Sequence, residues 1–520
     1  MRLFRGSASA GGGRLSAAQG ALALLAGLLH TASFAPLEAW WLQVLAVGLL
    51  FWGVRRLSPG SAAGAGLAFG FSWLASGLWW LFISMYRYGG LPAPVAAAAV
   101  ALLSLALSVY LALAMAAFAR WRTGRAGPDV LLFAACWLLA ELARATWLTG
   151  FPWLASGYAH TSGPLAHWAP WVGVYAIGAL AAGLGAALFV AVPGGLGASP
   201  LGGWSWRALA GPGLGAALVL GAGAVLPQDF TISVGRMTVS LLQPNIAQDL
   251  KFDASRMAAN FEQLGRALES ARGTLVVTPE SVVPLPLAVV EPAQWQRLRH
   301  AVSQPGRAAL VGVFTGDEQN GYVNSMVALS ADSDAQGAQA YRYGKQHLLP
   351  FGEFIPFGFG WFVHAMDIPL DDQARGTNSR PLRLGSQRLR PLICYEDLFG
   401  EDIVGSVVGD DAATVFVNAS NLAWFGAWMV QDQHLQFSRM RALEFERPFV
   451  RATNTGATTV IDHRGRVAAR LDAGVAGVLE SEFEGRIGST PYARWLAAAG
   501  LWPLWGLALA VVAWAARRRA

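Results

Sequence analysis

Ionisable side chains are scarce in this 520-residue chain. Only 13% of its residues are Asp, Glu, Lys or Arg, whereas 54% are hydrophobic and 22 are tryptophan. So little charge over this length argues against a purely soluble protein and is typical of a membrane protein. The formal net charge of +6 comes largely from arginines in the loops between apolar stretches. It therefore indicates membrane topology and gives no support to nucleic-acid binding.

Cysteine occurs only twice. Because Cys136 lies within a hydrophobic stretch, Cys394 has no evident disulfide partner. The apolar run 391–393 ends at Cys394, and acidic residues follow it. We expect a buried strand that delivers Cys394 to the carboxyl edge of a sheet, where α/β enzymes place their chemistry. A lone cysteine there is either a candidate nucleophile or a small buried hydrophobic residue.

Lysine is equally rare. Of the 38 basic residues only Lys251 and Lys345 are lysine, and the rest are arginine. A lysine retained against this bias suggests a position that needs a compact charge with an adjustable pKa, where a planar guanidinium will not serve. The alternative is chance retention on a solvated loop, and it has more weight for Lys251 than for Lys345.

Motifs for metals and nucleotides are missing. The eight histidines show no His-x-His or His-Glu-x-x-His spacing, and no phosphate-binding P-loop is present. The sequence therefore predicts neither a metal site nor a cofactor.

Apolar stretches long enough to cross a bilayer, or nearly so, number eight. They lie near 16–35, 39–54, 61–84, 94–118, 129–147, 166–192, 208–226 and 493–515. Arginines mark both ends of the chain and alternate loops, whereas the other short loops, 85–93 and 148–165, contain only Arg87. This positive-inside pattern predicts that both termini are cytoplasmic. The first stretch could instead be a cleaved signal peptide, because basic, apolar and small-residue regions follow in order.

Acidic residues divide the chain into parts. Residues 15–228 are nearly free of them, whereas 245–490 contain most of the Asp and Glu. We therefore expect a membrane domain of seven spanning helices over 1–228 and a soluble domain over 229–490 on the outer face. A last spanning helix and a basic cytoplasmic tail would occupy 491–520.

Short apolar runs alternate with helical patterns in the expected outer domain. This alternation predicts a layered α/β sandwich. The expected helices lie near 257–268, 292–303, 400–408 and 428–446. The expected strands lie near 237–243, 274–278, 308–313, 322–330, 339–344, 391–393, 413–417, 449–461 and 477–482.

Polar residues follow several of these strands. Glu280 comes after the second strand, Cys394 after a later one, and Asn418 and Asn421 after the next, while Lys345 opens another loop. Because the carboxyl ends of parallel strands meet at one edge of a sheet, a nucleophile, carboxylates and an amine can converge there.

Three motifs together resemble those of the nitrilase superfamily. They are Thr278-Pro279-Glu280, Lys345-x-His-Leu-x-Pro-Phe-Gly-Glu353 and Ile393-Cys394-Tyr395-Glu396. Eight helices around an outward nitrilase-like domain resemble the apolipoprotein N-acyltransferase family, and this resemblance covers essentially the whole chain. It implies a membrane α-helical bundle of eight spanning helices joined to an αββα sandwich domain.

The resemblance also implies a Glu-Lys-Cys triad. Cys394 would be the nucleophile, Glu280 the general base, and Lys345 the group that stabilises the oxyanion, as the chemistry of a protonated thiol requires. Supporting or substrate-binding positions would be Glu353, Glu396, Tyr395, Asn421, Trp424 and Phe252.

Two positions depart from the family pattern. Phe252 stands where the family commonly has Trp after the lysine, and Leu422 stands where it commonly has Asp after Ser-Asn. Both departures leave the triad intact and put contacts with the lipid or the acceptor in question.

The reaction that the resemblance implies is ping-pong acyl transfer. Cys394 would take an acyl chain from a membrane phospholipid, with phosphatidylethanolamine as the expected donor. It would pass the chain to the α-amine of the N-terminal S-diacylglyceryl-cysteine of an apolipoprotein. The implied location is the bacterial inner membrane with a periplasmic catalytic domain, and a monomer suffices. The alternatives are a membrane-tethered nitrilase-like amidase acting on a small amide, and a non-catalytic lipid-binding protein.

Aromatic residues crowd the stretch after Lys345. They include Phe351, Phe354, Phe357, Phe359, Trp361 and Phe362. Because so many exposed aromatics would be a liability on a soluble domain, we expect this stretch to dip into the bilayer surface as a lid or acyl-chain guide. Ordinary core packing is the alternative.

Overall fold

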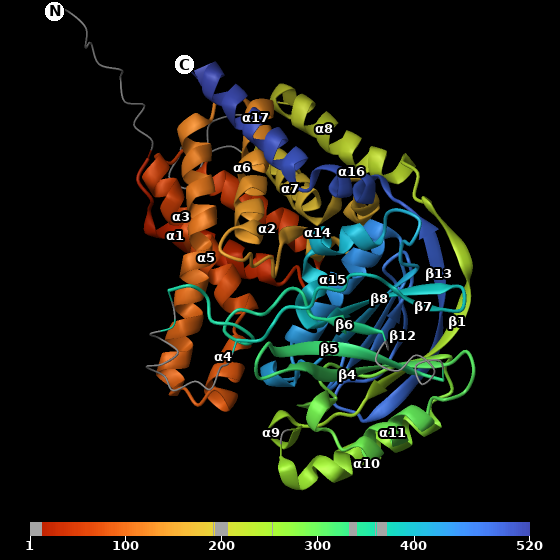
Figure 1. Cartoon of the computed structure of the whole chain (residues 1–520). Helices are drawn as coiled ribbons and strands as arrows, with labels where there is room; N and C mark the ends of the chain where they lie inside the picture. Colours follow the sequence, from red (N-terminus) through yellow and green to blue (C-terminus); the bar gives the residue numbers. More distant parts are fainter. Residues whose placement is uncertain are drawn as a thin grey trace, which may run out of the picture.

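The computed structural model describes residues 13–190, 192, 206–251, 253–331, 341–358, 360 and 372–519. A bundle of apolar helices packs against a sandwich of two β-sheets (Figure 1). The C-terminal helix ends at the end of the bundle that lies farthest from the sheets.

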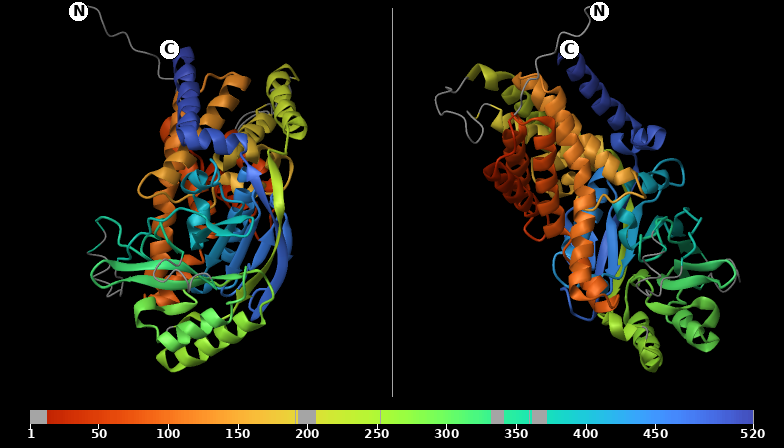
Figure 2. Two further views of the ribbon diagram at one scale, coloured as in Figure 1. Left: turned by 45° about the vertical axis from the view of Figure 1, so that its right-hand side comes forward. Right: turned by 90° about the vertical axis from the view of Figure 1, so that its left-hand side faces the viewer.

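Apolar helices form the bundle. They are α1 (Ala17–Thr31), α2 (Trp40–Val54), α3 (Pro59–Gly77), α4 (Leu81–Ile83), η1 (Ser84–Tyr88), α5 (Ala93–Trp121), α6 (Ala126–Thr146), α7 (Ala169–Phe189), α8 (Trp206–Val225), α16 (Pro491–Ala499) and α17 (Trp502–Arg519). The side chains of Ser16 and Ser58 accept hydrogen bonds from the first turns of α1 and α3, which fixes where these helices begin. With 29 residues, α5 is about 43 Å long and extends beside the sheets (Figure 2).

Helices occupy each of the stretches predicted to cross the membrane, but two stretches bend by more than 40° at a break. The stretch 61–84 bends by 59° between α3 and the segment Leu81–Tyr88. The C-terminal stretch bends by 85° between α16 and α17, so two helices occupy the apolar stretch predicted over 493–515. Gly500, with a φ of +56°, follows α16, and Pro503 lies in the first turn of α17, where proline suits a new start.

Three of the described helices are long and apolar enough to cross a membrane by themselves. They are Ala93–Trp121, Ala126–Thr146 and Pro164–Phe189, and the number rises to five if each bent pair is counted as one span. Ala17–Thr31, Trp40–Val54 and Gly211–Val225 are apolar but shorter. The helical bundle therefore has three to five candidate spans among the described residues, and the count of eight stays a prediction.

Two sheets form the sandwich. The first has the strand order β13-β1-β2-β4-β5-β6 with β3 paired to β4, and the second has the order β12-β11-β10-β9-β8-β7. The first contains β1 (Thr231–Gln243), β2 (Leu275–Val277), β3 (Val283–Pro286), β4 (Ala308–Asp317), β5 (Gly321–Ser330), β6 (Arg342–Gly344) and β13 (Gly477–Gly488). The second contains β7 (Leu382–Leu384), β8 (Gln387–Ile393), β9 (Val415–Ser420), β10 (Phe449–Thr453), β11 (Thr459–Ile461) and β12 (Val467–Arg470).

Helices cover the outer faces of both sheets, so the domain has four layers (Figure 1). On the first sheet, α10 (Met257–Ser270) and α11 (Pro292–His300) bury their apolar faces against the strands. On the second sheet lies α15 (Val430–Phe445), which also contacts α7 of the bundle. This arrangement confirms the predicted α/β sandwich.

Short or polar strands escaped prediction from the sequence. The strands β3, β7 and β12 have three or four residues each, and no apolar alternation marks β12, which is largely exposed. The strand predicted over 413–417 continues to Ser420, so Asn418 lies within β9 and not after it. The amide of Asn418 is satisfied there, because it donates to Cys394 O and accepts from Ser420.

The segment between α6 and α7 joins the bundle to the sandwich. Residues 152–161 are all buried. Tyr158 donates to the carbonyl oxygen of Leu398 at 2.9 Å. The carbonyl oxygen of the Gln433 side chain on α15 accepts from the indole N–H groups of Trp153 (2.9 Å) and Trp80 (3.2 Å). These hydrogen bonds make α15 part of both halves of the molecule.

We expect Gln433→Leu to destabilise the protein. The substitution leaves the buried indole N–H of Trp153 without this acceptor, at a cost of about 1–3 kcal/mol, whereas Trp80 keeps its hydrogen bond to the carbonyl oxygen of Gly77. The measurement is the thermal unfolding temperature in detergent, which should fall. Gln296→Leu, on the exposed side of α11, is the matched control and should leave it unchanged. Equal unfolding temperatures for the two variants would contradict this account of the interface.

Candidate active site

Cys394 directly follows β8, as predicted, and begins the short helix η7 (Cys394–Leu398). Its φ of +54° is left-handed, a conformation that non-glycine residues rarely adopt outside functional sites. Its backbone carbonyl accepts a hydrogen bond from the Asn418 side chain at 2.8 Å. The thiol is free and Cys394 is 8% exposed. The turn therefore presents a nearly buried thiol at the end of a central strand.

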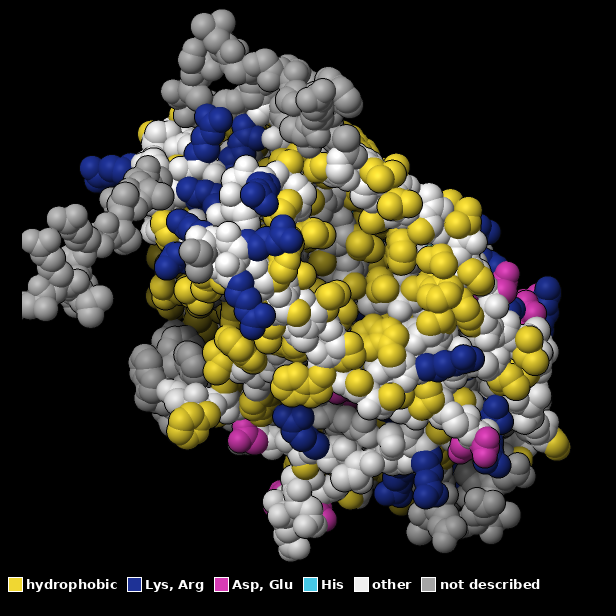
Figure 3. All heavy atoms as spheres, turned by 90° about the horizontal axis from the view of Figure 1, so that it is seen from above, with side chains coloured by type: hydrophobic (Ala, Val, Ile, Leu, Met, Phe, Trp, Pro, Cys, Tyr) yellow, Lys and Arg dark blue, Asp and Glu magenta, His cyan; other side chains and the backbone are white. Residues whose placement is uncertain are grey.

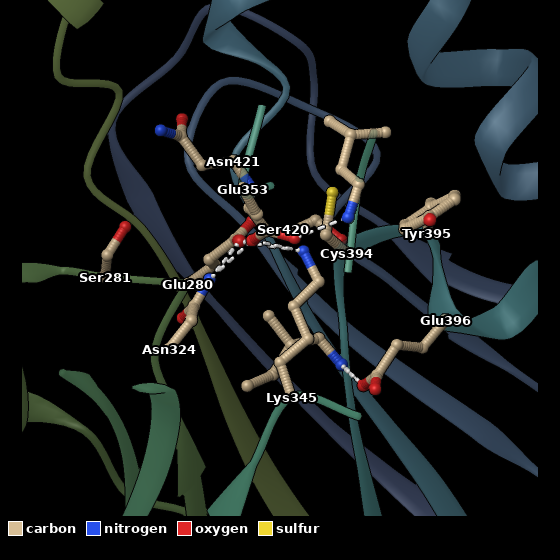
Figure 4. Close-up of polar contacts among 12 residues, drawn as sticks. Glu280, Ser281, Asn324, Lys345, Glu353, Cys394, Tyr395, Glu396, Ser420 and Asn421 are labelled. Carbon is tan, nitrogen blue, oxygen red and sulfur yellow. Dashed lines mark hydrogen bonds and ion pairs between the residues drawn. The ribbon is translucent and has the colours of Figure 1, made fainter. Parts of the chain in front are cut away.

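A lysine and two glutamates meet beside this thiol (Figure 4). The Lys345 Nζ atom lies 2.7 Å from Glu353 Oε1 and 3.6 Å from Glu280 Oε1. Lys345 follows β6 and Glu280 lies in the loop after β2. All three side chains are buried. The structure thus brings together the four residues on which the sequence prediction depends most.

Neutral donors hold both carboxylates. The Asn324 side chain donates to Glu280 Oε1 (2.7 Å) and to Glu353 Oε1 (3.3 Å). The backbone N–H of Asn421 donates to Glu280 Oε2 (3.0 Å), and that of Leu349 donates to Glu353 Oε2 (2.8 Å). All four oxygen atoms of the two buried carboxyl groups therefore accept hydrogen bonds, which offsets part of the cost of desolvation.

Electrostatics set the protonation of the thiol and the amine. Burial, reinforced by Glu280, raises the pKa of the Cys394 thiol well above its usual value, and Lys345 opposes this shift. For Lys345, burial disfavours the ammonium, but Glu353 and Glu280 outweigh it and raise the pKa well above the usual value. At neutral pH the site therefore holds a protonated thiol beside an ammonium. Such a thiol needs a nearby base to take its proton as it attacks.

Glu396 stabilises the turn that begins at Cys394. Its carboxylate accepts from the Tyr343 hydroxyl (2.8 Å) and from the backbone N–H groups of Ile393 (2.6 Å), Gln346 (2.7 Å) and His347 (3.1 Å). Burial raises its pKa, and the backbone donors oppose this shift. Glu396 thus ties the end of β8 to the loop that begins with Lys345.

Tyr395 and Asn421 also lie at the site. The ring centroid of Tyr395 is 5.6 Å from Lys345 Nζ, and its hydroxyl donates to the carbonyl oxygen of Leu348 at 2.6 Å. The side chain of Asn421 donates to Gln248 Oε1 at 2.8 Å, while its backbone holds Glu280.

Two predicted positions remain, Trp424 and Phe252. Trp424 packs edge-on against Tyr88 of η1, with 5.5 Å between ring centroids, so it contacts the helical bundle. Phe252 lies outside the described residues.

Both lysines of the chain belong to this site. Lys251 Nζ donates to the backbone carbonyl of Glu280 (3.1 Å) and to the Ser281 hydroxyl (2.8 Å). Burial lowers its pKa to about 8. The alternative of a solvated loop is wrong for both residues, since Lys251 is 3% and Lys345 1% exposed.

Sequence reasoning missed Asn324, which bridges the two carboxylates. It lies on β5 at a position where the strand is buried. The available signal was an amide in the middle of an apolar strand, since a buried amide needs partners. Over the ranges that the structure describes, no group of three or more His, Cys, Asp or Glu could hold a metal ion.

The free thiol, the lysine and the glutamates lie at the strand ends of a four-layer α/β sandwich, and the part of the chain that holds them matches a known class of enzymes, the carbon–nitrogen hydrolases. The carbon-nitrogen hydrolase family model matches residues 238–492. The model of the apolipoprotein N-acyltransferase N-terminal domain matches residues 26–187.

Relatives match nearly the whole chain. The apolipoprotein N-acyltransferase of Verminephrobacter eiseniae is 47% identical over 506 residues, which cover 92% of this chain and 92% of the relative. That of Ralstonia nicotianae is 43% identical over 507 residues, covering 96% and 94%. The chain therefore belongs to the apolipoprotein N-acyltransferase family and is an acyltransferase.

Solved structures that resemble this chain cover about half of it. A CN-hydrolase superfamily protein from Xanthomonas campestris has a TM-score of 0.37 and 17% identity, covering 51% of this chain and 96% of its own. An amidase of the nitrilase superfamily from Nesterenkonia has a TM-score of 0.36 and 17% identity, covering 51% and 96%.

Lys345→Met should make the Cys394 thiol less reactive towards a small alkylating agent. The ammonium lowers the pKa of the thiol, so its removal raises that pKa further and leaves less thiolate at any given pH. Alkylation by iodoacetamide, followed by intact mass across neutral and alkaline pH, should slow about tenfold for each unit of the rise.

Two controls accompany this measurement. Cys394→Ala gives the background from Cys136. Lys251→Met removes the other ammonium, which bonds the Glu280 carbonyl and Ser281, and should shift the profile less. Faster alkylation of Lys345→Met than of the wild type would contradict the proposed electrostatics.

Proposed function

We propose that this protein transfers an acyl chain from a membrane phospholipid, through a thioester on Cys394, to an apolipoprotein. The acceptor is the α-amine of the N-terminal S-diacylglyceryl-cysteine, and the donor is phosphatidylethanolamine. Membership of the apolipoprotein N-acyltransferase family supports this proposal. A monomer suffices for the reaction, because all the residues that we assign to it come from one chain.

One observation carries the proposal beyond family membership. The loop that begins at Asn421 donates its first backbone N–H to Glu280. A few residues on, Trp424 packs against Tyr88, and Phe425 packs against Trp80, with ring centroids 5.0 Å apart. The same short loop thus contacts a site carboxylate and the apolar helices. A hydrolase of small amides has no use for this contact, whereas an enzyme that takes acyl chains from a bilayer must hold its thiol at the membrane.

The first half-reaction loads the enzyme. Cys394 Sγ attacks the ester carbonyl carbon of the phospholipid while Glu280 accepts the thiol proton. The oxyanion forms beside the Lys345 ammonium, which stabilises it strongly because the site excludes water. The bond between the acyl carbon and the glycerol oxygen then breaks, and Glu280 returns the proton to that oxygen. Lysophospholipid leaves, and the acyl chain stays as a thioester.

The second half-reaction transfers the chain. The acceptor amine attacks the thioester carbonyl, Glu280 takes a proton from the amine, and Lys345 again faces the oxyanion. The C–S bond breaks and the Cys394 thiolate recovers the proton from Glu280. Glu353, Glu396 and Tyr395 keep these groups in place. Water must be excluded, since hydrolysis of the thioester would release a fatty acid.

We further propose eight spans in the bacterial inner membrane. Residues 1–228 would be the membrane domain, 229–490 the periplasmic catalytic domain, and 491–520 the last span and tail. Arg122 donates to Leu57 O and Arg519 to Ala119 O, so several loops and the C-terminus meet at one end of the bundle. Arginine side chains gather on that face (Figure 3), which supports a cytoplasmic position for it.

Part of the aromatic stretch after Lys345 is exposed. Phe357 is 105% and Phe351 43% exposed, while Phe359, Trp361 and Phe362 lie outside the described residues. Exposed aromatic rings near the site support our proposal that this stretch meets the bilayer surface.

The proposal predicts a covalent intermediate. Purified protein incubated with phosphatidylethanolamine and no acceptor should gain the mass of one acyl chain on Cys394, and hydroxylamine should remove it. Cys394→Ser should show no hydroxylamine-sensitive gain. Intact-protein mass spectrometry with peptide mapping is the measurement. Suppose that the folded wild-type protein is alkylated at Cys394 by iodoacetamide but never gains an acyl chain. This result would refute the lipid-donor mechanism and favour a small-amide hydrolase.

A further inference from the structure

A buried charged cluster lies beside η7, the turn that begins at Cys394 and that we call the nucleophile turn. The proposed reaction does not use this cluster. It consists of Asp397 on η7, His434 and Ser438 on α15, and Arg451 on β10, and each of these residues is 0% exposed. Buried charges are costly unless they are paired and hydrogen-bonded. A charged cluster in this place therefore calls for a functional explanation.

Hydrogen bonds converge on the Asp397 carboxylate. Its Oδ2 atom accepts from the Arg451 guanidinium (3.0 Å) and from the Ser438 hydroxyl (2.5 Å), and its Oδ1 atom lies 3.3 Å from His434 Nε2. Arg451 also lies 2.5 Å from His434 Nδ1. Since the guanidinium only donates, Nδ1 must be the acceptor, which assigns the imidazole hydrogen to Nε2, facing Asp397.

The charge states agree with these contacts. Burial opposes ionisation of Asp397, but His434 and Arg451 outweigh it and hold its pKa below the usual range. Burial lowers the pKa of His434. The cluster therefore contains an ion pair between Asp397 and Arg451, with the imidazole of His434 beside it.

The cluster and the thiol share one helical turn. Cys394 begins η7 in a left-handed conformation, and such conformations persist only where the surrounding structure holds them. Asn418 on β9 binds the carbonyl of Cys394, and Arg451, its register partner on β10, binds Asp397. Two paired residues on adjacent strands, Asn418 and Arg451, thus hydrogen-bond to Cys394 and to Asp397 of the same turn.

We propose that Asp397 is a positioning residue for the acyl transfer. Clamped by hydrogen bonds from Arg451 and Ser438, and with His434 Nε2 3.3 Å away, it holds η7 in the conformation that aims the Cys394 thiol at the ester carbonyl. The proposal rests on the role of Cys394 as nucleophile stated above. Asp397 does not activate the thiol electrostatically, because its negative charge raises the pKa of Cys394.

The helical bundle closes this cluster from water. The ring of Trp153, from the segment between α6 and α7, stacks on the His434 ring with 5.9 Å between centroids. The same indole donates to Gln433. The clamp therefore works in a dry environment, where its hydrogen bonds are strongest, and the bundle contributes to the rigidity of the nucleophile turn.

Two rates measured on Asp397→Asn test this proposal. The first is the rate of thioester formation from phosphatidylethanolamine at saturating lipid, which needs an aimed thiol. It should fall by about 100-fold, the loss typical of a misplaced reacting group, while the KM for lipid stays unchanged. The second is the rate of alkylation by iodoacetamide, which needs only thiolate. It should not fall, because removal of the negative charge lowers the pKa of the thiol.

Glu444→Gln is the matched control. Glu444 forms another buried ion pair on α15, 3.0 Å from Arg441, and its carboxylate accepts from the backbone N–H of Val174 on α7. Its loss should lower the unfolding temperature and leave the rate of thioester formation unchanged. Should Asp397→Asn not fold, Ser438→Ala removes one donor, keeps the ion pair, and should show the same pattern with a smaller loss.

Each outcome decides the question. Wild-type rates of thioester formation in Asp397→Asn or in folded Ser438→Ala would overturn the inference and leave the proposed function standing. An equal fall of both rates would also overturn it, since it would show general damage to the site. If the wild type itself forms no thioester, the proposed function and the inference fail together.

Discussion

The buried ammonium of Lys345 and its two carboxylate neighbours set the main constraint on this structure. Without the lysine, Glu280 and Glu353 would be two adjacent charges in a site closed to water, and without the glutamates the ammonium would be an unpaired buried charge. Either state is costly. The lysine follows β6 and Glu280 follows β2, so the three charges meet only when the first sheet is formed. Cys394 follows a strand of the second sheet. Its thiol therefore lies beside the ammonium only when the two sheets have packed together.

The same constraint explains why α15 is the central helix of the molecule. One side of it carries His434 and Ser438, which hold the nucleophile turn through Asp397. Another carries Gln433 and Glu444, which bond to residues of the helical bundle. Packing of the bundle and geometry of the thiol therefore depend on one rigid element. This arrangement suits the acyl transfer that we propose, in which a water-sensitive thioester forms at a membrane.

Sequence patterns predicted the elements well where apolar residues decide the structure. Apolar length located the helices, and short apolar runs located β1, β2, β4, β5 and β8. Patterns failed where a break depends on backbone conformation, as at Gly500, or where polar residues are buried inside a strand, as at Asn418. The candidate site was predicted for a related reason. The scarcity of lysine and cysteine drew attention to Lys345 and Cys394, and motif resemblance added Glu280, Glu353 and Glu396.

The sequence by itself determined the division into apolar helices and an α/β domain, and it determined the chemistry available at the strand ends, because hydrophobic periodicity and residue type are local properties. Only the tertiary structure decided which groups meet. The roles of Asn324 and Lys251, the clamp on Asp397, and the contact of the Asn421 loop with Tyr88 and Trp80 join residues far apart in the chain. Their positions follow from sheet register and from the packing of α15 against the bundle, which no local pattern encodes.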